Sequence, residues 1–177
     1  RGAVSTGFRA PALQQQYFTA TSTNIISGTA TEVGTFPATS PVSAVLGAKA
    51  LEPEESKNYS LGLVYHRGPF EVTVDAYQID IDNRIVLSEN IQGSATGTAT
   101  QQAIYTLLRP YGVTTARFFI NGVDTTTKGV DVVVRYRLDA AEAGRFDLTL
   151  AGNYNETEVT RLPTTNTLSS LPVPPAL

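Results

Sequence analysis

The sequence lacks several features that mark large classes of protein. It contains no cysteine, which excludes a disulfide framework, a thiolate metal site and a cysteine nucleophile. Its 13 Lys and Arg residues against 16 Asp and Glu give a net charge of −3, and no basic cluster could neutralise nucleic-acid phosphates. No apolar run reaches about 18 residues, so no transmembrane helix is predicted. These absences exclude nucleic acid as a partner and leave β-strands as the main structural signal.

Five segments carry apolar residues at alternate positions, the pattern of strands with one apolar and one polar face. They are Gly2–Phe8, Tyr59–Tyr65, Phe70–Tyr77, Val130–Leu138 and Phe146–Tyr154. Alternation is loose in the first segment and clear in the other four. We therefore predict an all-β chain of about five antiparallel strands.

The connections between these strands are of two kinds. His66–Pro69 and Ala140–Gly144 are short turns with Gly or Pro as reversal residues. Three segments, about 14–55, 84–118 and 158–177, are predicted to be long loops. Loops of this length argue against a compact soluble domain, whereas tight turns on one side and long outer loops on the other are expected of an outer-membrane β-barrel.

Within the second loop, Gln101–Leu108 is predicted to form one or two helical turns. Strand three is expected to run on to about Asp82, and strand four to begin as early as Phe118.

The two faces of the predicted strands differ sharply. One is apolar, as expected toward lipid, and the opposite face is charged and polar, as expected toward an aqueous or plugged lumen. Aromatic residues near the strand ends are predicted to form membrane girdles: Tyr59, Tyr65, Phe70, Tyr136, Phe146 and Tyr154. Five polar residues are predicted to face the lumen: Asp75, Asp131, Arg135, Asp147 and Asn153.

Two details fit the barrel poorly. The alternating stretches Tyr59–Tyr65 and Phe146–Tyr154 span roughly 14–19 Å at about 3.3 Å per residue and about 45° tilt, less than an apolar band about 25 Å tall. Tyr77 also breaks the alternation of its strand, which suggests a β-bulge there.

No catalytic constellation or metal site is predicted. His66 is the only histidine and lies in a turn, where it is expected to be solvated. Asp80-Ile-Asp82-Asn83 begins like a calcium loop, but Ile85 stands where glycine is required. We therefore expect neither an enzyme nor a cofactor.

Several motifs resemble those of TonB-dependent outer-membrane receptors, in family order over most of residues 1–160. Gly7-Phe-Arg-Ala-Pro-Ala-Leu13 is similar to a strand-end motif of that family, with Ala12 where Ser is common. Leu51-Glu-Pro-Glu-Glu-Ser-Lys-Asn58 resembles the start of its next descending strand, and Val74–Ile85 the ascending strand that follows. Asn121–Asp131, with Gly129-Val-Asp131, resembles a further descending strand, with Lys128 where Arg often occurs, and Asn153–Thr157 closes the series.

The resemblance implies a 22-stranded barrel filled by an N-terminal plug domain in the bacterial outer membrane. It also implies import of a small-molecule ligand, commonly a ferric siderophore, with energy from the TonB–ExbB–ExbD complex. Neither a plug nor a TonB box is present in this sequence, nor are the last strands. About five strands cannot close a barrel, which needs at least 8, so we expect residues 1–177 to be a partial barrel domain that forms an open curved sheet.

Aromatic residues in the long loops are the candidates for contact with a ligand: Tyr17, Phe18, Phe36, Tyr105 and Tyr111. Two alternatives remain open. A passive outer-membrane porin would conduct without energy input. A soluble β-sandwich that binds carbohydrate or mediates adhesion would also have alternating strands, although the loop asymmetry and the placement of aromatics favour the barrel.

Overall fold

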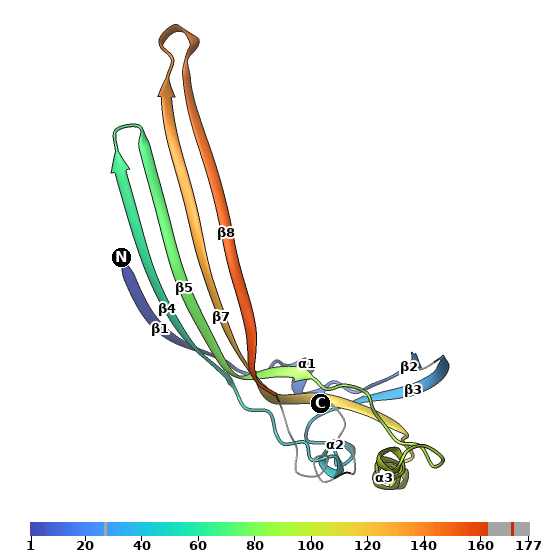
Figure 1. Ribbon diagram of the computed structural model, residues 1–177. Coiled ribbons are helices and arrows are strands. Elements are labelled where there is room, and N and C mark those ends of the chain that lie inside the picture. Colours follow the sequence, from blue (N-terminus) through green and yellow to red (C-terminus); the bar gives the residue numbers. More distant parts are fainter. Residues whose placement is uncertain (27, 163–170, 172–177) are drawn as a thin grey trace. The chain divides into compact units, whose positions relative to one another are not determined.

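The computed structural model describes residues 1–26, 28–162 and 171 (Figure 1). The chain divides into two compact units, to each of which β5 and β7 contribute residues. The first, here called the sheet unit, comprises Arg1–Phe8, Glu55–Asp82 and Asp124–Thr160. The second, here called the loop unit, comprises Arg9–Glu54, Asn83–Val123 and Arg161–Leu177.

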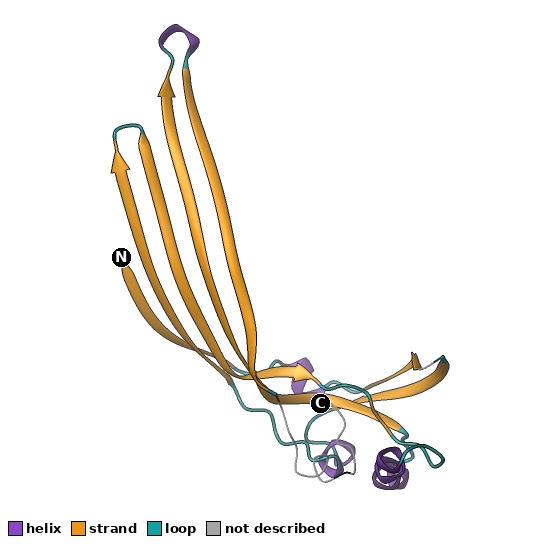
Figure 2. Ribbon diagram, in the orientation of Figure 1, coloured by secondary structure: helices purple, strands orange, loops and turns teal. Residues whose placement is uncertain are grey.

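Five long strands supply the sheet unit, and short turns join two pairs of them (Figure 2). They are β1 (Gly2–Arg9), β4 (Glu54–Arg67), β5 (Phe70–Leu87), β7 (Thr115–Asp139) and β8 (Arg145–Arg161). Their spatial order is β1-β4-β5-β7-β8. The prediction of five strands in an open curved sheet is confirmed.

The β4–β5 hairpin shows how the sequence sets the register. Pairing is unbroken from Glu55 opposite Asp82 to Arg67 opposite Phe70, so the two-residue alternation is in step on both strands. Only Gly68 and Pro69 make the turn, which is shorter than the four residues predicted. Gly68 has φ of +57°, a conformation that glycine adopts without steric cost.

The second short turn lies where it was predicted. β7 ends at Asp139 and β8 begins at Arg145. A 3-10 turn at Ala141–Ala143 joins them, and Gly144 has φ of +92°. The Ala140 amide donates to the Gly144 carbonyl at 2.8 Å and closes the turn.

The strands are longer than their alternating stretches suggested. β4 has 14 residues and β5 has 18, while β7 has 25 and β8 has 17. The bulge expected at Tyr77 is wrong, because the register of β4 and β5 continues through it without an extra residue. The polar segments beyond the apolar alternation keep extended backbone because they still pair with their neighbours.

The loop unit holds regular structure where the sequence was interpreted as loop. Residues 14–55 include a hairpin of β2 (Ala20–Ile26) and β3 (Thr29–Phe36), with α1 (Leu13–Tyr17) before it and α2 (Pro41–Val45) after it. Residues 84–118 include β6 (Ile91–Gln92), α3 (Ala99–Leu108) and a 3-10 turn (Arg109–Tyr111). The prediction of helical turns within Gln101–Leu108 is confirmed. Most of the predicted 158–177 loop falls outside the described residues, and β8 continues to Arg161.

The loop unit has its own hydrophobic core. The first residues of β7 pair in parallel with β3 and antiparallel with β6, so segments far apart in sequence meet there. Thr98 and Gln101 form a capping box that starts α3, which places Ile104 and Leu108 on one buried face. The buried core residues are Val42, Leu46, Ile91, Ile104, Leu108, Ala116, Phe118 and Ile120.

Candidate functional site

The sheet unit presents one polar face, on which neighbouring strands place charged side chains together. In the β4–β5 register, Gly62 lies opposite Asp75 and His66 opposite Glu71. Because side chains alternate strictly along each strand, these residues share a face. The contacts on the next strands show that this face continues across β7 and β8.

Ion pairs join the strands on the polar face. Arg1 Nη2 lies 2.5 Å from Asp75 Oδ2, and Arg135 Nη1 lies 3.5 Å from Glu71 Oε1. Asp147 Oδ1 lies 3.5 Å from Arg137 Nε and 3.7 Å from Arg145 Nη2. Asn153 donates a hydrogen bond to Asp131. Most of these groups are exposed to solvent, so the pairs add little stability but give the face a dense layer of fixed charge.

Tyr77 belongs to the polar face as well. It is two residues from Asp75 on an unbroken strand, and its ring covers Gly129 of β7, where a Cβ atom would overlap it. Covering of a strand glycine by a neighbouring aromatic ring holds register between strands. Because Tyr77 interrupts the apolar alternation, it was interpreted as the site of a β-bulge, and its packing over Gly129 was not predicted.

The opposite face is apolar and exposed. The six predicted girdle aromatics all lie on it with 37–69% of their surface accessible. Leu61, Leu63 and Leu148 lie between them and are exposed too. A contiguous apolar surface of this kind marks an interaction site or a membrane contact.

Charges bound the apolar face at both ends of β4. Arg67 lies beside Phe70 at the turn, and Lys57 lies opposite Asp80 and 3.8 Å from Asp82 at the other end. From Lys57 to Arg67, at about 3.3 Å per residue and about 45° tilt, the strand covers about 23 Å of depth, close to an apolar band about 25 Å tall. The charges on β4 are therefore spaced close to the height of such a band, while the apolar stretch from Tyr59 to Tyr65 between them still covers about 14 Å.

Within the loop unit, Glu54 joins three segments of the chain. Its carboxylate accepts two hydrogen bonds from the Arg9 guanidinium, at 2.8 Å from Nε and 2.6 Å from Nη2. The same carboxylate accepts the buried Ile85 amide at 2.8 Å. The hydrogen bonds from Arg9 hold the pKa of Glu54 below its ordinary value, and the Ile85 amide adds to this against the opposing effect of burial.

Asn121 makes a second junction of the same kind. Its Oδ1 accepts the Glu52 amide at 2.7 Å, and its Nδ2 donates to the carbonyls of Glu52 and Asn83 at 2.8 and 2.7 Å. Asn83 adopts φ of +55°, and its side chain accepts a bond from Arg161 at 3.1 Å. Asn121 and Glu54 thus satisfy backbone groups where pairing between the long strands ends.

The two-faced sheet, its short turns and its long connections agree with a comparison against known families. A family model described as TonB dependent receptor-like, beta-barrel matches residues 1–175. The chain belongs to this family. No curated protein matches it. TonB-dependent receptors are outer-membrane transporters rather than enzymes.

The candidate ligand contacts of this receptor barrel differ in their surroundings. Tyr17 and Phe18, at the end of α1, are exposed, as is Tyr111 after α3. Phe36 ends β3 and packs against the loop-unit core, and Tyr105 is half-buried on α3. The structure therefore leaves three of the five aromatics free to meet a ligand and commits Phe36 to packing.

Neither a metal-binding group of side chains nor a membrane-spanning helix is found in the described part of the receptor barrel. Among residues 1–26, 28–162 and 171, no group of three or more His, Cys, Asp or Glu side chains could hold a metal ion. No helix in these ranges is long and apolar enough to cross a membrane. His66 lies in β4 opposite Glu71 rather than in a turn.

The residues that sequence reasoning missed are Arg9, Glu54 and Asn121. All three lie in the segments that resembled family motifs, yet no role was predicted for them. Their function depends on partners 31 to 69 positions away in the chain, such as Ile85 for Glu54 and Glu52 for Asn121. Spacing along the sequence carries no signal for contacts of that kind.

Proposed function

We propose that this chain forms part of the membrane-embedded wall of an outer-membrane transporter that captures a scarce ligand and imports it with energy from the TonB–ExbB–ExbD complex. The observation that carries the proposal is the sheet with an exposed apolar face bounded by charges and an opposite face of ion pairs. Such a wall separates lipid from a hydrated lumen.

The apolar face is the surface that contacts outer-membrane lipid. Tyr65, Phe70, Tyr136 and Phe146 lie beside the short turns, and Tyr59 and Tyr154 lie toward the other ends of their strands. Aromatic side chains favour the two membrane interfaces because they combine an apolar ring with a polar or polarisable edge. The six residues therefore act as two girdles.

The polar face is the lumen wall. Its charged and polar residues, among them Asp75, Asp131, Arg135, Asp147 and Asn153, are well suited to meet the plug domain or ordered water. Because Asp75, Arg135 and Asp147 already pair within the sheet, a plug that slides past them need not leave these charges isolated.

The ligand is a small molecule, and a ferric siderophore is the best candidate because it is the commonest cargo of the family. Tyr17, Phe18 and Tyr111 are the contacts that we propose. Each offers an exposed ring that can stack on a flat or aromatic chelator.

The test is uptake of iron-labelled siderophores by cells that carry the whole receptor, with and without TonB. We expect uptake only with TonB, and about tenfold weaker binding in a Tyr17→Ala, Phe18→Ala double variant, because exposed aromatic anchors dominate binding energy. Leu13→Ala, an exposed apolar change on the same helix, is the matched control and should bind normally.

Two outcomes would contradict separate parts of the proposal. Uptake that persists without TonB would point to a passive porin. Normal binding by the double variant would show that Tyr17 and Phe18 do not contact the ligand. It would leave the proposal of TonB-dependent transport standing. A soluble β-sandwich gains no support, since the sheet unit is a single layer whose apolar face has no second sheet packed on it.

A further inference from the structure

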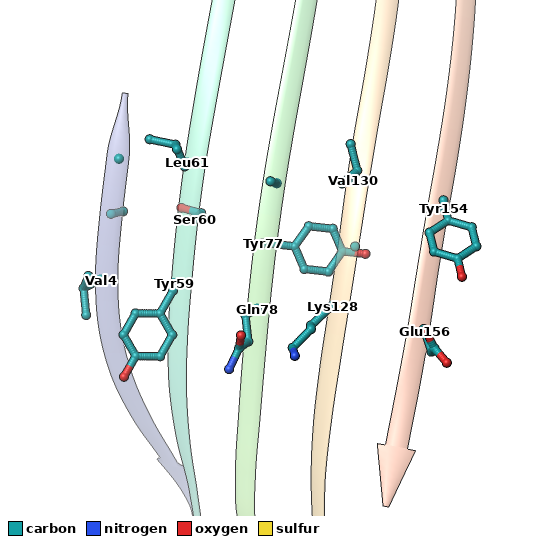
Figure 3. A pocket seen from close by; sticks show the side chains of 14 residues that line it. Val4, Tyr59, Ser60, Leu61, Tyr77, Gln78, Lys128, Val130, Tyr154 and Glu156 are labelled. Carbon is teal, nitrogen blue, oxygen red and sulfur yellow. The ribbon is translucent and has the colours of Figure 1, made fainter.

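The two units of the chain differ in the sign of their charge. The loop unit has six basic side chains against four glutamates, and the sheet unit has seven basic side chains against twelve acidic ones. Basic side chains of the sheet unit have acidic neighbours. Lys57 lies 3.8 Å from Asp82, and Lys128 lies on β7 between Gln78 and Glu156 of the adjoining strands (Figure 3). The loop unit, which holds the proposed ligand contacts, is therefore the part of the chain that attracts an anion.

One cation of the loop unit has no counter-charge. Arg117 of β7 is partly buried, and its Nε donates to the hydroxyl of Thr35 on β3 at 2.8 Å. Within residues 1–26, 28–162 and 171 it makes no salt bridge, and none of the remaining residues is Asp or Glu. Thr35 is buried, so its hydrogen bond fixes the guanidinium and leaves the two terminal nitrogens as donors for another group.

A buried hydroxyl without a partner lies near Arg117. Thr115 is two residues earlier on β7, about 7 Å along the strand, and alternation puts both side chains on the same face. The Thr115 side chain is completely buried, and its Oγ1 meets no hydrogen-bond partner in the described part of the chain. A hydroxyl in this state destabilises the protein, and a ligand atom that bonds it would recover the loss.

These polar groups are not part of the hydrophobic core. The other face of the same strands carries Phe36, Ile91 and Phe118, which pack in the loop-unit core. The registers of β3 and β6 with β7 bring four polar side chains together on the face away from that core, here called the β7 polar patch: Thr35, Gln92, Thr115 and Arg117. Each can donate a hydrogen bond and none is a carboxylate, which is the donor set that recognises an anion.

We propose that the β7 polar patch binds a carboxylate of the imported ligand, so that the ligand is an anionic chelate with a free carboxylate group. The terminal nitrogens of Arg117 give two parallel hydrogen bonds to the carboxylate oxygens, and the Thr115 hydroxyl gives a third. Because that hydroxyl is enclosed, binding requires the side chains that cover it to move. The inference rests on the proposed function, in which the loop unit meets a small-molecule ligand.

The test is equilibrium dialysis of two ferric chelates against the whole receptor in detergent. Ferric citrate is the carboxylate probe, and ferrichrome, a neutral hydroxamate chelate, is the matched probe without a carboxylate. We expect ferric citrate to bind more tightly, and Arg117→Gln to weaken its binding about 10- to 150-fold, the range for hydrogen bonds to charged groups. Arg117→Lys should recover part of this loss, because it keeps the charge without the paired donors. Lys49→Gln removes an exposed cation of the same unit and should bind normally.

Thr115→Val separates a role in binding from a role in folding. The substitution keeps the shape of the side chain and removes the unsatisfied hydroxyl, so amides of β6 and the start of β7 should gain protection from hydrogen exchange in the free receptor. Ferric citrate should nevertheless bind about 2- to 12-fold more weakly, the effect of one neutral hydrogen bond. Unchanged binding, or a loss of protection, would contradict the role given to Thr115.

The remaining outcomes distinguish this inference from the proposed function. Equal affinity for the two chelates, unchanged binding in Arg117→Gln, or binding of neither chelate would overturn the inference. Uptake of ferrichrome that needs TonB, without binding of ferric citrate, would overturn it and leave the proposed function standing. Uptake of ferric citrate by cells without TonB would overturn the proposed function and leave the carboxylate site standing.

Discussion

Replacing Glu54 with alanine is expected to loosen the loop unit while the strands of the sheet unit stay paired. The Glu54 side chain is only 11% exposed and accepts the Ile85 amide, and Ile85 is buried. Glu54→Ala leaves that amide without a partner away from water. An unsatisfied buried donor costs about 1–3 kcal/mol.

That cost should appear as faster local opening rather than as global unfolding. About 1–3 kcal/mol corresponds to roughly a 5- to 150-fold increase in hydrogen exchange at Ile85 and nearby amides of the loop unit. The measurement is hydrogen–deuterium exchange by mass spectrometry on the whole receptor in detergent. Amides of the β4–β5 hairpin near Gly68 serve as the internal reference and should keep their rates.

The neighbouring carboxylate provides the control for this experiment. Glu55 is exposed and faces the other side of β4, so Glu55→Ala should leave exchange at Ile85 unchanged. Equal acceleration in both variants would show that the Glu54 contacts do not hold the loop unit, and no acceleration in Glu54→Ala would refute the reasoning directly.

Two further predictions follow from contacts already described. Gly129→Ala should lower the free energy of unfolding in urea by about 1–3 kcal/mol, because the added Cβ would overlap the Tyr77 ring. Gly152→Ala on β8 is the control and should be neutral, because a Cβ there meets no atom. Equal effects of the two substitutions would contradict the packing of Tyr77 over Gly129. Since Arg9 lowers the folded-state pKa of Glu54, the stabilisation is complete above its ordinary value of about 4.5 and is lost as the pH falls through the lowered value. Exchange protection at Ile85 should therefore decrease in acid in the unsubstituted receptor but not in Glu54→Ala, and a parallel decrease in both would argue against this linkage.

The strands were predictable because their faces differ. Leu61, Leu63 and Tyr65 alternate with small or polar residues, and Val72 and Val74 alternate in step on the next strand, so local pattern and final register agree. The short turns were predictable for a related reason, since Gly68 and Gly144 supply the positive φ that reversal requires. Strand ends were underestimated because the alternation of apolar residues stops before the pairing does.

The loop unit could not be predicted in the same way. Segments such as Thr29–Phe36 are rich in threonine, which was interpreted as loop composition although β-branched residues favour strands. The parallel pairing of Phe36 with Phe118 joins residues far apart in sequence, and the core around Phe118 forms only when those segments meet. The partners of Glu54 and Asn121 were hidden for the same reason.

The interruption of alternation at Tyr77 has a physical meaning other than a bulge. Before Tyr77, β5 places Val72, Val74 and Ala76 on the apolar face; after it, the same face carries Gln78, Asp80 and Asp82, while Ile79 and Ile81 fall on the polar side. The backbone register does not change, so the environment of each face must change instead. A strand that leaves lipid for water requires that exchange, because its outer face then needs polar side chains. If this face meets lipid, as we propose, the reversed phase on an unbroken strand indicates the level at which β5 leaves the membrane, beside Tyr59 of β4.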